Sequence, residues 1–492
     1  MRLTSILGAI GASCAETDIR RTEMTGLTAD SREAGQGDLF FAVEGASADG
    51  HDYLEQAQKK GAVAAVVSRN VDGCSLPQIL VPDTREALAL AACEFYNHPS
   101  ESFPLIGITG TNGKTTVAWL VHQLMQRRGI CCGLLGTIYN VIAPDDAQKA
   151  GLTTAMPHQV QRMLAQMRDR GNRAAVMEVS SHALDQKRTM GTRYQVAVFT
   201  NLTPDHLDYH TDMDSYFDAK TILFKEMSKT GRSVVGLDDP WGEKLAGMID
   251  GPLISFGRRK DCDIRITGWK PLENSSEIEL EVFGRKVTAE VGLLGGFNAQ
   301  NIAAACGVAV AMGISADFLE ENIPALTPVP GRMEPVLAGQ NFNVLVDYAH
   351  TPDALDKALD AAREHTTGKL VSIVGCGGDR MKEKRAPMGK ISLSKADFTV
   401  VTSDNPRSEN PKVIIEQILE GVSQGGGREG ENYIVEPDRR KAIHAALEMM
   451  ADGDTLLIAG KGHEDYQILP TGTIHFDDRE VAREKLGELG FK

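Results

Sequence analysis

The sequence predicts an α/β protein built from three domains. Its 492 residues correspond to about three domains of ordinary size. Short apolar runs that are typical of buried strands alternate with helical patterns along most of the chain, and this alternation favours mostly parallel sheets. Hydrophobic residues make up 42% of the chain and charged residues 24%, so each domain has enough apolar material for a core.

The first domain is predicted over residues 1–101 as a small α/β unit. Apolar runs at Asp38–Val43 and Ala62–Val67 predict strands. The segment between them, Gly50–Gly61, has apolar residues at helical spacing. Turn-forming residues are frequent in Asn97–Pro104, which we therefore interpret as the first linker.

The second domain is predicted over residues 102–330 and the third over residues 331–492. The boundary between them falls in a proline-rich segment, Pro324–Pro335. Each of these domains is expected to contain a mostly parallel sheet, and the sheet of the third domain is expected to be Rossmann-like. The strand-like runs are Leu105–Ile108, Ala174–Met177, Val196–Phe199 and Ser233–Val235, then Asn343–Val346, Leu370–Val374, Phe398–Val401 and Thr455–Ala459.

The composition argues against several classes of protein. The net charge of −15 opposes non-specific attraction to nucleic acid or to an anionic membrane, so no nucleic-acid partner is expected. The chain has no run of eighteen apolar residues, and Leu3–Ala12 lacks the features of a signal peptide, so no membrane insertion is expected. The eight cysteines form no C-x-x-C pair, which is typical of reduced thiols. We expect a cytoplasmic monomer.

A glycine-rich octet with the sequence T-G-T-N-G-K-T-T lies between a predicted strand and a predicted helix. Glycines let the backbone wrap a phosphate chain, and the helix N-terminus presents N–H groups to it. Lys114 would neutralise the β- and γ-phosphates, and Thr115 would offer its hydroxyl to Mg²⁺. The usual pattern has glycine where this chain has Ile108. The central sheet is thus predicted to be a P-loop-type ATPase domain, with its nucleotide contacts at Gly110, Thr111, Asn112, Gly113, Lys114, Thr115 and Thr116.

A carboxylate, Glu178, directly follows the predicted strand Ala174–Met177. The carboxyl ends of parallel strands form the ligand-binding edge of an α/β sheet. Because the glycine-rich octet lies at the end of a strand of the same sheet, we expect Glu178 to lie beside it. Oxygen ligands suit a hard cation, so Glu178 is a candidate ligand of Mg²⁺.

The octet resembles the phosphate loop of the Mur ligases and of the related folylpolyglutamate synthases. The stretch N-L-T-P-D-H-L-D-Y-H resembles a Mur ligase segment whose first histidine binds a second magnesium ion, which implies that role for His206. The resemblance also implies that Lys220 is carbamylated. A carbamate would replace an ammonium group beside magnesium and triphosphate with an anionic oxygen ligand.

Other segments resemble the nucleotide-handling motifs of this family. An F-N-A-Q-N segment implies that Asn301 lies near adenine, and a G-R-M-E stretch implies that Arg332 reaches the phosphates. A D-Y-A-H-T-P stretch implies that Asp347 and His350 face the nucleotide. The resemblance implies catalytic roles for Lys114, Glu178, His206, Lys220, Arg332 and Asp347, and metal ligation by Thr115, Glu178, His206 and Lys220.

Three further segments resemble the part of the family site that holds the nucleotide-linked substrate. A D-S-R stretch implies contact with a uridine diphosphate group, and an S-S-H-x-L-x-x-x-R layout implies contact with a muramyl peptide. The loop Leu152–Ala155 resembles a T-T-P-type substrate loop, although relatives have Asn before the threonine pair and Pro after it. The implied residues are Ser31, Thr153, Thr154, Ser180, Gln186 and Arg188.

A D-N-P-R sequence follows the predicted strand Phe398–Val401 and resembles the signature of Mur ligases that add meso-diaminopimelate. Lysine-adding relatives lack the arginine. Diaminopimelate differs from lysine by a distal carboxylate, which a planar guanidinium binds in bidentate fashion. The implied contacts are Arg380, Asp404, Asn405, Pro406 and Arg407, with Gly460 and Glu464 receiving ammonium groups.

Taken together, these resemblances imply an ATP- and Mg²⁺-dependent ligase of peptidoglycan precursor synthesis. Its substrates would be meso-diaminopimelate and UDP-N-acetylmuramoyl-L-alanyl-D-glutamate, joined at D-glutamate through an acyl phosphate. A lysine-adding Mur ligase, a folylpolyglutamate synthase and a non-catalytic nucleotide-binding switch remain as alternatives. Arg407 argues against the first, the N-terminal domain with Ser31 argues against the second, and the paired metal residues argue against the third.

Overall fold

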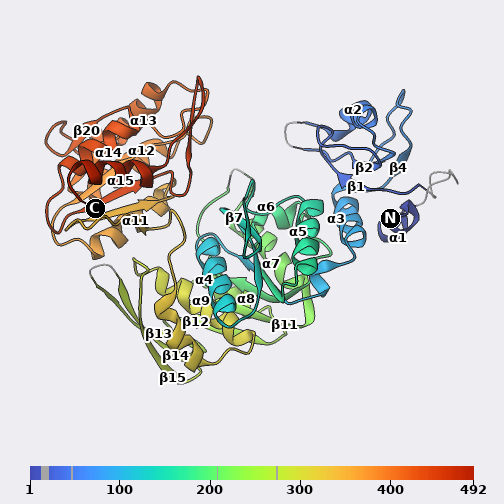
Figure 1. The fold of residues 1–492 in the computed structure, drawn as a ribbon, viewed down its shortest axis with the longest axis horizontal. Coiled ribbons are helices and arrows are strands. Elements are labelled where there is room, and N and C mark those ends of the chain that lie inside the picture. The colour runs from blue at the N-terminus through green and yellow to red at the C-terminus, as the bar shows by residue number, and fades with distance from the viewer. Residues whose placement is uncertain (13–21, 46–47, 208, 273–274, 492) are drawn as a thin grey trace. The chain divides into compact units, whose positions relative to one another are not determined.

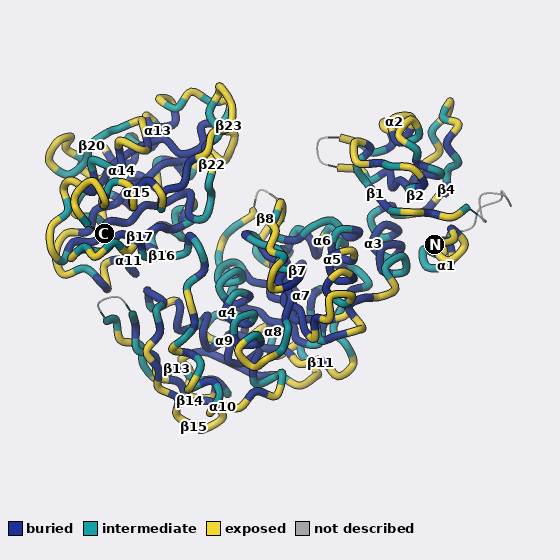
Figure 2. Tube along the Cα trace, in the orientation of Figure 1, coloured by how far each residue is buried: buried dark blue, intermediate teal, exposed yellow. Residues whose placement is uncertain are grey.

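The computed structural model describes residues 1–12, 22–45, 48–207, 209–272 and 275–491 (Figure 1). They fall into two compact units. The first is Met1–Arg265 with Ala303–Ser315, and the second is Ile266–Ile302 with Ala316–Lys492. Buried residues lie along the strands, and exposed residues are concentrated in the loops (Figure 2). Within the described ranges, no helix has the length and apolar character needed to cross a membrane.

The N-terminal sheet of the first unit has four parallel strands in the order β1-β2-β3-β4. Successive residues of β2 point to opposite faces, so Leu39 packs with Leu3 and Leu88 on one face. Phe40 packs with Leu54 on the other face. This is the small α/β sheet that the sequence predicts. Its elements are α1 (Leu3–Ala9), β1 (Gly26–Thr28), β2 (Asp38–Phe41), α2 (Leu54–Lys59), β3 (Ala64–Val67), β4 (Gln78–Leu80) and α3 (Thr84–Phe95).

The central sheet has eleven strands in the order β15-β14-β13-β12-β11-β10-β5-β9-β6-β7-β8. The strands from β12 through β11, β10, β5 and β9 to β6 pair in parallel, as predicted. The strands are β5 (Leu105–Thr109), β6 (Cys132–Leu135), β7 (Tyr139–Ala143), β8 (Asp146–Lys149), β9 (Ala174–Glu178), β10 (Tyr194–Phe199), β11 (Met227–Gly236), β12 (Leu253–Gly257), β13 (Ile264–Pro271), β14 (Ser276–Val282) and β15 (Arg285–Val291).

The strands at the centre of this sheet are buried along their whole length, which explains their continuous apolar sequence. In β5 and β9 every residue is buried. Helices α5 and α7 contribute Leu164 and Leu223 to a core that also holds Leu105 and Ala197. The helices are α4 (Lys114–Arg127), α5 (Pro157–Asp169), α6 (Ser181–Asp185), α7 (Met213–Lys225), α8 (Pro240–Ala246), α9 (Asn298–Ala311) and α10 (Ala316–Asn322).

The C-terminal sheet has the strand order β16-β17-β21-β18-β19-β20, and all its strands except β16 pair in parallel. Helices α11, α12 and α13 share one core cluster and α14 and α15 share the other, so the sheet is covered on both faces. This is the predicted Rossmann-like arrangement. The strands are β16 (Glu334–Pro335), β17 (Asn343–Asp347), β18 (Leu370–Val374), β19 (Phe398–Val401), β20 (Tyr433–Val435) and β21 (Thr455–Ala459). The helices are α11 (Pro352–Glu364), α12 (Arg385–Lys395), α13 (Pro411–Gln424), α14 (Arg439–Glu448) and α15 (Asp478–Glu488).

The position of β21 determines where this sheet can bind a ligand. Strand β21 lies between β17 and β18. The helix after β17, α11, packs on one face of the sheet, and the helix after β21, α15, packs on the other. Such a switch point opens a crevice outside the carboxyl ends of the strands. Asp347, Gly375, Thr402 and Gly460 lie at the carboxyl ends of these strands.

Helices α12 and α13 pack with their backbones almost in contact. A Cβ atom at Gly389 of α12 would overlap the carbonyl oxygen of Ile418, and one at Gly421 of α13 would overlap that of Ala386. Glycine is therefore required at both positions by the neighbouring helix. The two helices begin just after the loops that carry Arg380 and the D-N-P-R sequence.

Several strands that pair antiparallel lie outside the β–α alternation read from the sequence. They are β7 with β8, β14 with β15, and β22 (Tyr466–Leu469) with β23 (Gly472–His475). Strand β14 alternates buried and more exposed residues, as one-sided strands do, and β23 is fully exposed. Such strands lack the continuous apolar runs by which the buried parallel strands are recognised.

Candidate active site

The loop between β5 and α4 has a backbone that only glycine allows at two positions. Gly110 has φ of 144° and Gly113 has φ of 85°, both in the region that favours glycine. A Cβ atom at Gly110 would overlap Thr200 Oγ1. The loop then enters α4 at Lys114, so its N–H groups and the helix N-terminus face the same place. This is the geometry of a phosphate-binding loop.

The segment that follows β10 holds this loop in place. The Thr111 N–H donates to the carbonyl of Asn201 at 2.9 Å, and the Asn112 N–H donates to Asn201 Oδ1 at 3.0 Å. Thr200 Oγ1 donates to the carbonyl of Asn112 at 2.7 Å, and Asn112 Nδ2 donates to Thr203 Oγ1 at 3.2 Å. Two neighbouring strands, β5 and β10, therefore support one loop.

Lys114 and Lys220 both donate to the carbonyl of Gly110, each at 2.9 Å. Lys114 also donates to the carbonyl of Thr111 at 2.9 Å. Lys220, on α7, is buried and lies 4.4 Å from the centre of the Tyr216 ring. Burial, followed by the charge of Lys114, lowers the pKa of Lys220 well below its usual value. The structure thus places both lysines at the loop.

Glu178 ends β9 and receives three hydrogen bonds. Thr115 Oγ1 donates to its Oε2 at 2.8 Å, Thr137 Oγ1 donates to the same oxygen at 3.0 Å, and the Thr137 N–H donates to Oε1 at 2.7 Å. Thr115 and Glu178 therefore present adjacent hard oxygen donors beside the loop, which fits a magnesium ion. Thr137 was not among the predicted residues.

His206 lies in a group of aromatic rings near the loop. Its ring centre is 4.8 Å from that of His182 and 6.1 Å from that of Tyr216. Its φ of 54° is unusual for a residue other than glycine. Burial, the largest influence, lowers the pKa of His206, which keeps a ring nitrogen available as a ligand. The described residues contain no group of three His, Cys, Asp or Glu side chains arranged to hold a metal ion.

The residues predicted to meet the muramyl peptide form one hydrogen-bonded network with Glu178. Thr154 Oγ1 donates to the carbonyl of Glu178 at 2.9 Å and accepts from the Ser180 N–H at 3.0 Å. Arg188 donates to the carbonyl of Thr154 at 3.0 Å and to Gln186 Oε1 at 2.7 Å.

Two more residues of the predicted substrate site lie in loops. Thr153 Oγ1 lies at hydrogen-bond distance, 3.2 Å, from Thr137 Oγ1, which links its loop to the same network. Ser31, after β1 in the N-terminal sheet, is buried and donates to Gln56 Oε1 at 2.8 Å.

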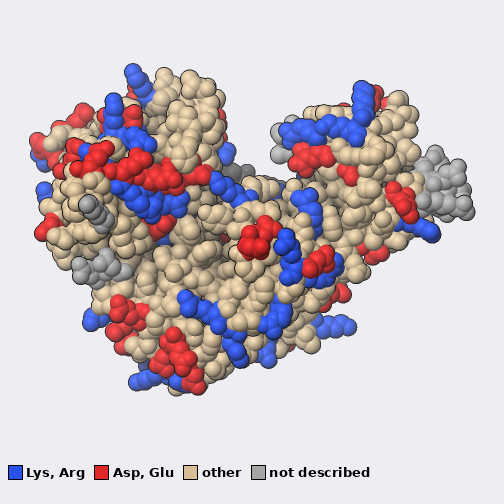
Figure 3. Space-filling model, viewed as in Figure 1, with Lys and Arg blue, Asp and Glu red and all other residues tan. Residues whose placement is uncertain are grey.

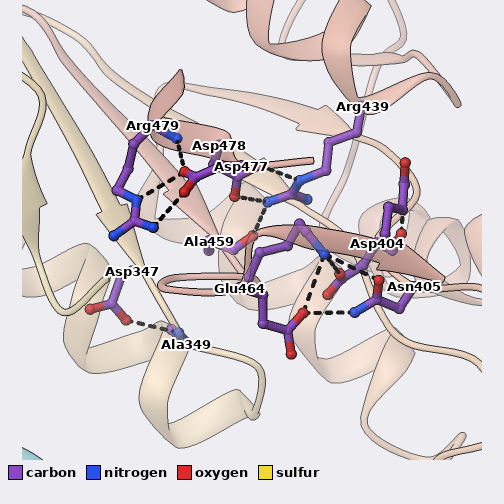
Figure 4. A network of polar contacts seen from close by, with 12 residues as sticks. Asp347, Ala349, Asp404, Asn405, Arg439, Ala459, Glu464, Asp477, Asp478 and Arg479 are labelled. Atoms are coloured by element: carbon purple, nitrogen blue, oxygen red, sulfur yellow. Dashed lines mark hydrogen bonds and ion pairs between the residues drawn. The ribbon is translucent and has the colours of Figure 1, made fainter. Parts of the chain in front are cut away.

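Several residues predicted to handle nucleotide lie in the second unit. Asp347, at the end of β17, accepts from the N–H of Met333 at 2.7 Å. It also accepts from the N–H of Ala349 at 2.8 Å (Figure 4). Its burial raises the pKa of this carboxyl. The guanidinium of Arg332 lies 4.8 Å from the centre of the Tyr348 ring. The hydrogen bond from Met333 to Asp347 thus holds the G-R-M-E segment against the carboxyl end of β17.

Two more residues of this predicted group lie at helix and strand ends. The Nδ1–H of His350 donates to the carbonyl of Tyr348 at 2.9 Å. Asn301 is buried on α9 and donates to Asn298 Oδ1 at 2.8 Å.

The ends of β19 and β21 bring four predicted amino-acid contacts together. Asn405 Nδ2 donates to Glu464 Oε2 at 2.7 Å (Figure 4). Asp404 Oδ2 lies 3.0 Å from where a Cβ of Gly460 would be. Asp404 and Asn405 are buried, and Glu464 has 13% of its side chain exposed. Two carboxylates beside an amide suit an ammonium group of a ligand.

Arg407 and Arg380 lie on two loops that are bonded to each other. Arg407 donates to the carbonyl of Gly378 at 2.8 Å, and the Gly378 N–H donates to the carbonyl of Asn405 at 2.9 Å. Arg407 has φ of 53° and Asp379 has φ of 54°, so both loops contain a strained residue. Pro406 lies between Asn405 and Arg407.

A buried arginine that was not predicted supports these loops. Arg385 is fully buried, forms bidentate contacts of 2.9 Å with Glu409, and donates to the carbonyl of Gly377 at 3.1 Å. This pairing lowers the pKa of Glu409 to about 2. Glu409 in turn accepts from the Asp379 N–H at 2.6 Å.

A glycine loop of this geometry at the carboxyl edge of a parallel sheet defines a P-loop nucleotide-binding protein. Three family models extend that assignment: the Mur ligase middle domain matches residues 108–309, the Mur ligase glutamate ligase domain matches residues 331–462, and the Mur ligase family catalytic domain matches residues 23–96. The chain belongs to the Mur ligase family of ATP-dependent enzymes that form amide bonds.

Relatives over the full length support this assignment. The chain is 43% identical over 492 residues to the UDP-N-acetylmuramoyl-L-alanyl-D-glutamate–2,6-diaminopimelate ligase of Gloeobacter violaceus, covering 99% of this chain and 98% of that one. It is 42% identical over 513 residues to the enzyme of the same name from Geobacter metallireducens, covering 100% and 99%. A solved structure of a ligase of that name has a TM-score of 0.71 at 29% identity and covers 100% of both chains.

Proposed function

We propose that the chain joins meso-diaminopimelate to the D-glutamate of UDP-N-acetylmuramoyl-L-alanyl-D-glutamate, with ATP converted to ADP and phosphate. Relatives at about 40% identity carry that name and match nearly the full chain. The observation that carries the proposal is the arrangement at the end of β19, where the buried Asp404 and Asn405 are followed, after Pro406, by Arg407. A guanidinium on the same loop as a buried carboxylate matches an amino acid that brings both a carboxylate and an ammonium group.

In the first step, a free carboxylate of the D-glutamyl residue attacks the γ-phosphorus of ATP. A P–O bond forms, the bond to ADP breaks, and an acyl phosphate results. Lys114 and the N–H groups at the start of α4 would stabilise the charge on the transferring phosphoryl group. The carboxylate alone is a poor acyl donor, which is why the reaction consumes ATP.

In the second step, the amine of diaminopimelate attacks the acyl carbon. The tetrahedral intermediate expels phosphate and the nitrogen loses a proton, giving the amide. Positioning is the main contribution of the protein, since none of its side chains has to form a covalent bond. Arg332 and Asp347 would help to position the nucleotide. Arg380, Arg407 and Glu464 would help to position the amino acid.

We further propose Thr115 and Glu178 as ligands of one magnesium ion, and His206 with Lys220 as ligands of a second. When bound, magnesium supplies charge neutralisation at the phosphates. An ammonium at position 220 does not fit beside a cation, whereas a carbamate does. Carbamylation joins the Lys220 amine to carbon dioxide and releases one proton. The buried position of Lys220, next to Lys114, supports the modified form.

The remaining proposals concern organisation. We propose domains over residues 1–101, 102–330 and 331–492 and a monomeric enzyme. The requirement for ATP as a substrate supports a cytoplasmic location. On the face drawn in Figure 3, acidic and basic side chains are interspersed, so the net charge of −15 is not concentrated in one patch of that face.

The test is phosphate release measured with ATP, Mg²⁺ and UDP-N-acetylmuramoyl-L-alanyl-D-glutamate, with one candidate amino acid added at a time. We expect release with meso-diaminopimelate and far less with L-lysine. Release with lysine as the preferred substrate would favour the lysine-adding alternative. Release with a folate and glutamate would favour a folylpolyglutamate synthase, and absence of release with every pair would favour a non-catalytic switch.

A further inference from the structure

The carboxyl edge of the C-terminal sheet holds a fully buried lysine that the proposed function does not use. Lys461 follows Gly460 at the end of β21, and none of its side chain is exposed. Its ammonium donates to Asn405 Oδ1 at 3.1 Å and to Glu464 Oε2 at 3.2 Å, and it lies 3.6 Å from Asp404 Oδ1. All three partners are residues proposed to contact the incoming amino acid.

These contacts fix the orientation of the amide and of one carboxylate. Asn405 Nδ2 donates to Glu464 Oε2 (Figure 4). The ammonium of Lys461 donates to the same oxygen, so both groups hold it. Asn405 Oδ1 accepts from Lys461 and from the Ile468 N–H at 2.9 Å. The amide therefore cannot rotate without losing hydrogen bonds at both ends.

The charges of the group do not cancel. Asp404 and Glu464 contribute two negative charges and Lys461 one positive charge, which leaves one negative charge. Arg439 does not change this balance, because it forms a bidentate ion pair with Asp478 in which both side chains are fully buried (Figure 4). Other titratable or charged side chains near the group are Tyr348, Tyr466, His350, Cys376, Lys384, Arg332, Arg380 and Arg407.

One oxygen of the group has no hydrogen bond. Asp404 is only 6% exposed, and among the described residues its Oδ1 has no hydrogen-bond partner. A buried carboxylate oxygen without a donor is costly, and a bound donor would relieve that cost. The group therefore offers one net negative charge and one unsatisfied acceptor to a ligand.

We infer that Lys461 is a positioning residue that orients Asn405 and Glu464 and reduces the charge of this pocket so that it accepts a single ammonium group. This inference rests on the proposed function, because it assigns the pocket to the amine end of the incoming amino acid. Without Lys461, two neighbouring carboxylates would share a buried site, and such a pair takes up a proton. A protonated carboxyl binds ammonium poorly, so the pocket would bind the amino acid only at higher pH.

The first variant is Lys461→Met, which keeps the length of the side chain and removes its charge. We expect the KM for diaminopimelate to rise more than kcat falls, with kcat/KM lower on the order of 100-fold at neutral pH. The acid limb of the pH profile of kcat/KM should move upward by about 1–3 pH units. A merely structural role would lower activity at all pH values without moving that limb.

The matched variant is the double substitution Lys461→Met with Asp404→Asn, which restores a single negative charge. We expect it to be more active than Lys461→Met alone and to return the acid limb toward that of the wild type. If Lys461→Met does not fold, the same comparison applies to solubility and thermal stability, since the double variant no longer buries two unpaired carboxylates. A double variant no better than the single one in either measurement overturns the inference.

The outcome also separates this inference from the proposed function. If the wild type releases no phosphate with diaminopimelate, the proposed function itself fails. If the wild type uses diaminopimelate and Lys461→Met has an unchanged pH profile and KM, only the role of Lys461 is wrong.

Discussion

Lys114 and Lys220 share one acceptor, the carbonyl oxygen of Gly110, and each ammonium lies 2.9 Å from it. Two like charges on one carbonyl repel each other, and one of them is fully buried. This explains why the pKa of Lys220 is well below its usual value, with burial as the larger cause and Lys114 as the next. The site therefore favours a Lys220 side chain that carries no positive charge.

We predict that Lys220→Ala lowers kcat by at least about 100-fold, because the proposed carbamate would be lost. Small carboxylates added to the assay should restore part of the rate by occupying the space of the missing group. The control is Lys225→Ala, an exposed residue at the end of the same helix. Electron density for an unmodified ammonium at full occupancy, with ATP bound, would contradict the carbamate.

Lys114→Ala should leave a folded protein whose phosphate release falls by about 100-fold or more, because the transferring phosphoryl group loses its fixed cation. Circular dichroism would report folding, and a phosphate-release assay would report turnover. The exposed Lys229→Ala serves as the control for loss of a positive charge. Near-normal release from Lys114→Ala would mean that the loop between β5 and α4 does not carry the reaction.

Arg407→Ala should reduce kcat/KM for diaminopimelate far more than it affects ATP binding. Lysine leaves the guanidinium without a carboxylate, so the wild type should prefer diaminopimelate on the order of a thousandfold. In Arg407→Ala the ratio of kcat/KM for diaminopimelate to kcat/KM for lysine should be smaller, mainly because kcat/KM for diaminopimelate falls. The comparison needs kcat/KM for both amino acids, with the exposed Arg428→Ala as control. A variant that keeps the full preference would show that Arg407 does not recognise the distal carboxylate.

The buried ion pair of Arg439 with Asp478 should be important for stability. Asp478→Asn leaves a buried guanidinium without its counter-charge, so we expect the free energy of unfolding to fall by about 3–5 kcal/mol. Glu484→Gln on the same helix breaks the exposed pair with Arg440 and should change it by less than about 1 kcal/mol. Urea unfolding of both variants measures the two changes in the free energy of unfolding. Equal losses of stability in Asp478→Asn and Glu484→Gln would contradict the prediction.

Glu226 should make stability depend on pH. Burial raises its pKa from 4.5 to about 8, although Thr189 Oγ1 donates to its Oε2 at 3.0 Å. Folding is therefore favoured by the protonated form, and this contribution is present below pH 4.5 and is lost as the pH rises to about 8. The free energy of unfolding of Glu226→Gln should exceed that of the wild type by about 2–4 kcal/mol above pH 8 and should be almost equal to it near pH 4.5. Thermal melts of both proteins across this pH range would show the difference in stability. A difference in Tm that stays the same at every pH would refute the prediction.

The parts of the fold that the sequence predicted are those whose signals are local. Strand β5, the glycine turn and helix α4 follow one another as an apolar run, two glycines and a helical pattern, and each is visible in a short window. The β14–β15 pair was not predicted, because its alternating pattern is shared by many exposed segments. The fold class therefore follows from the sequence, whereas the antiparallel additions do not.

The same distinction applies to the candidate site. Glu178 could be proposed because it ends a recognisable strand after a phosphate loop. Lys461 and Arg385 could not, since a lysine or arginine in a polar motif is usually exposed and nothing local indicates burial. Their burial depends on partners at distant positions, Asn405 for Lys461 and Glu409 for Arg385. Such residues can be identified only from the three-dimensional structure, in which the strands that carry their partners lie side by side.

The close packing of α12 on α13 has a consequence for substrate choice. Gly389 and Gly421 let the two helix backbones approach, and each helix begins just after one of the loops that carry Arg380 and Arg407. The spacing of these guanidinium groups is therefore determined by two glycines that never meet a substrate. A larger residue at either position would move the loops apart, so amino-acid preference in this enzyme can change through substitutions in the packing of helices as well as in the pocket.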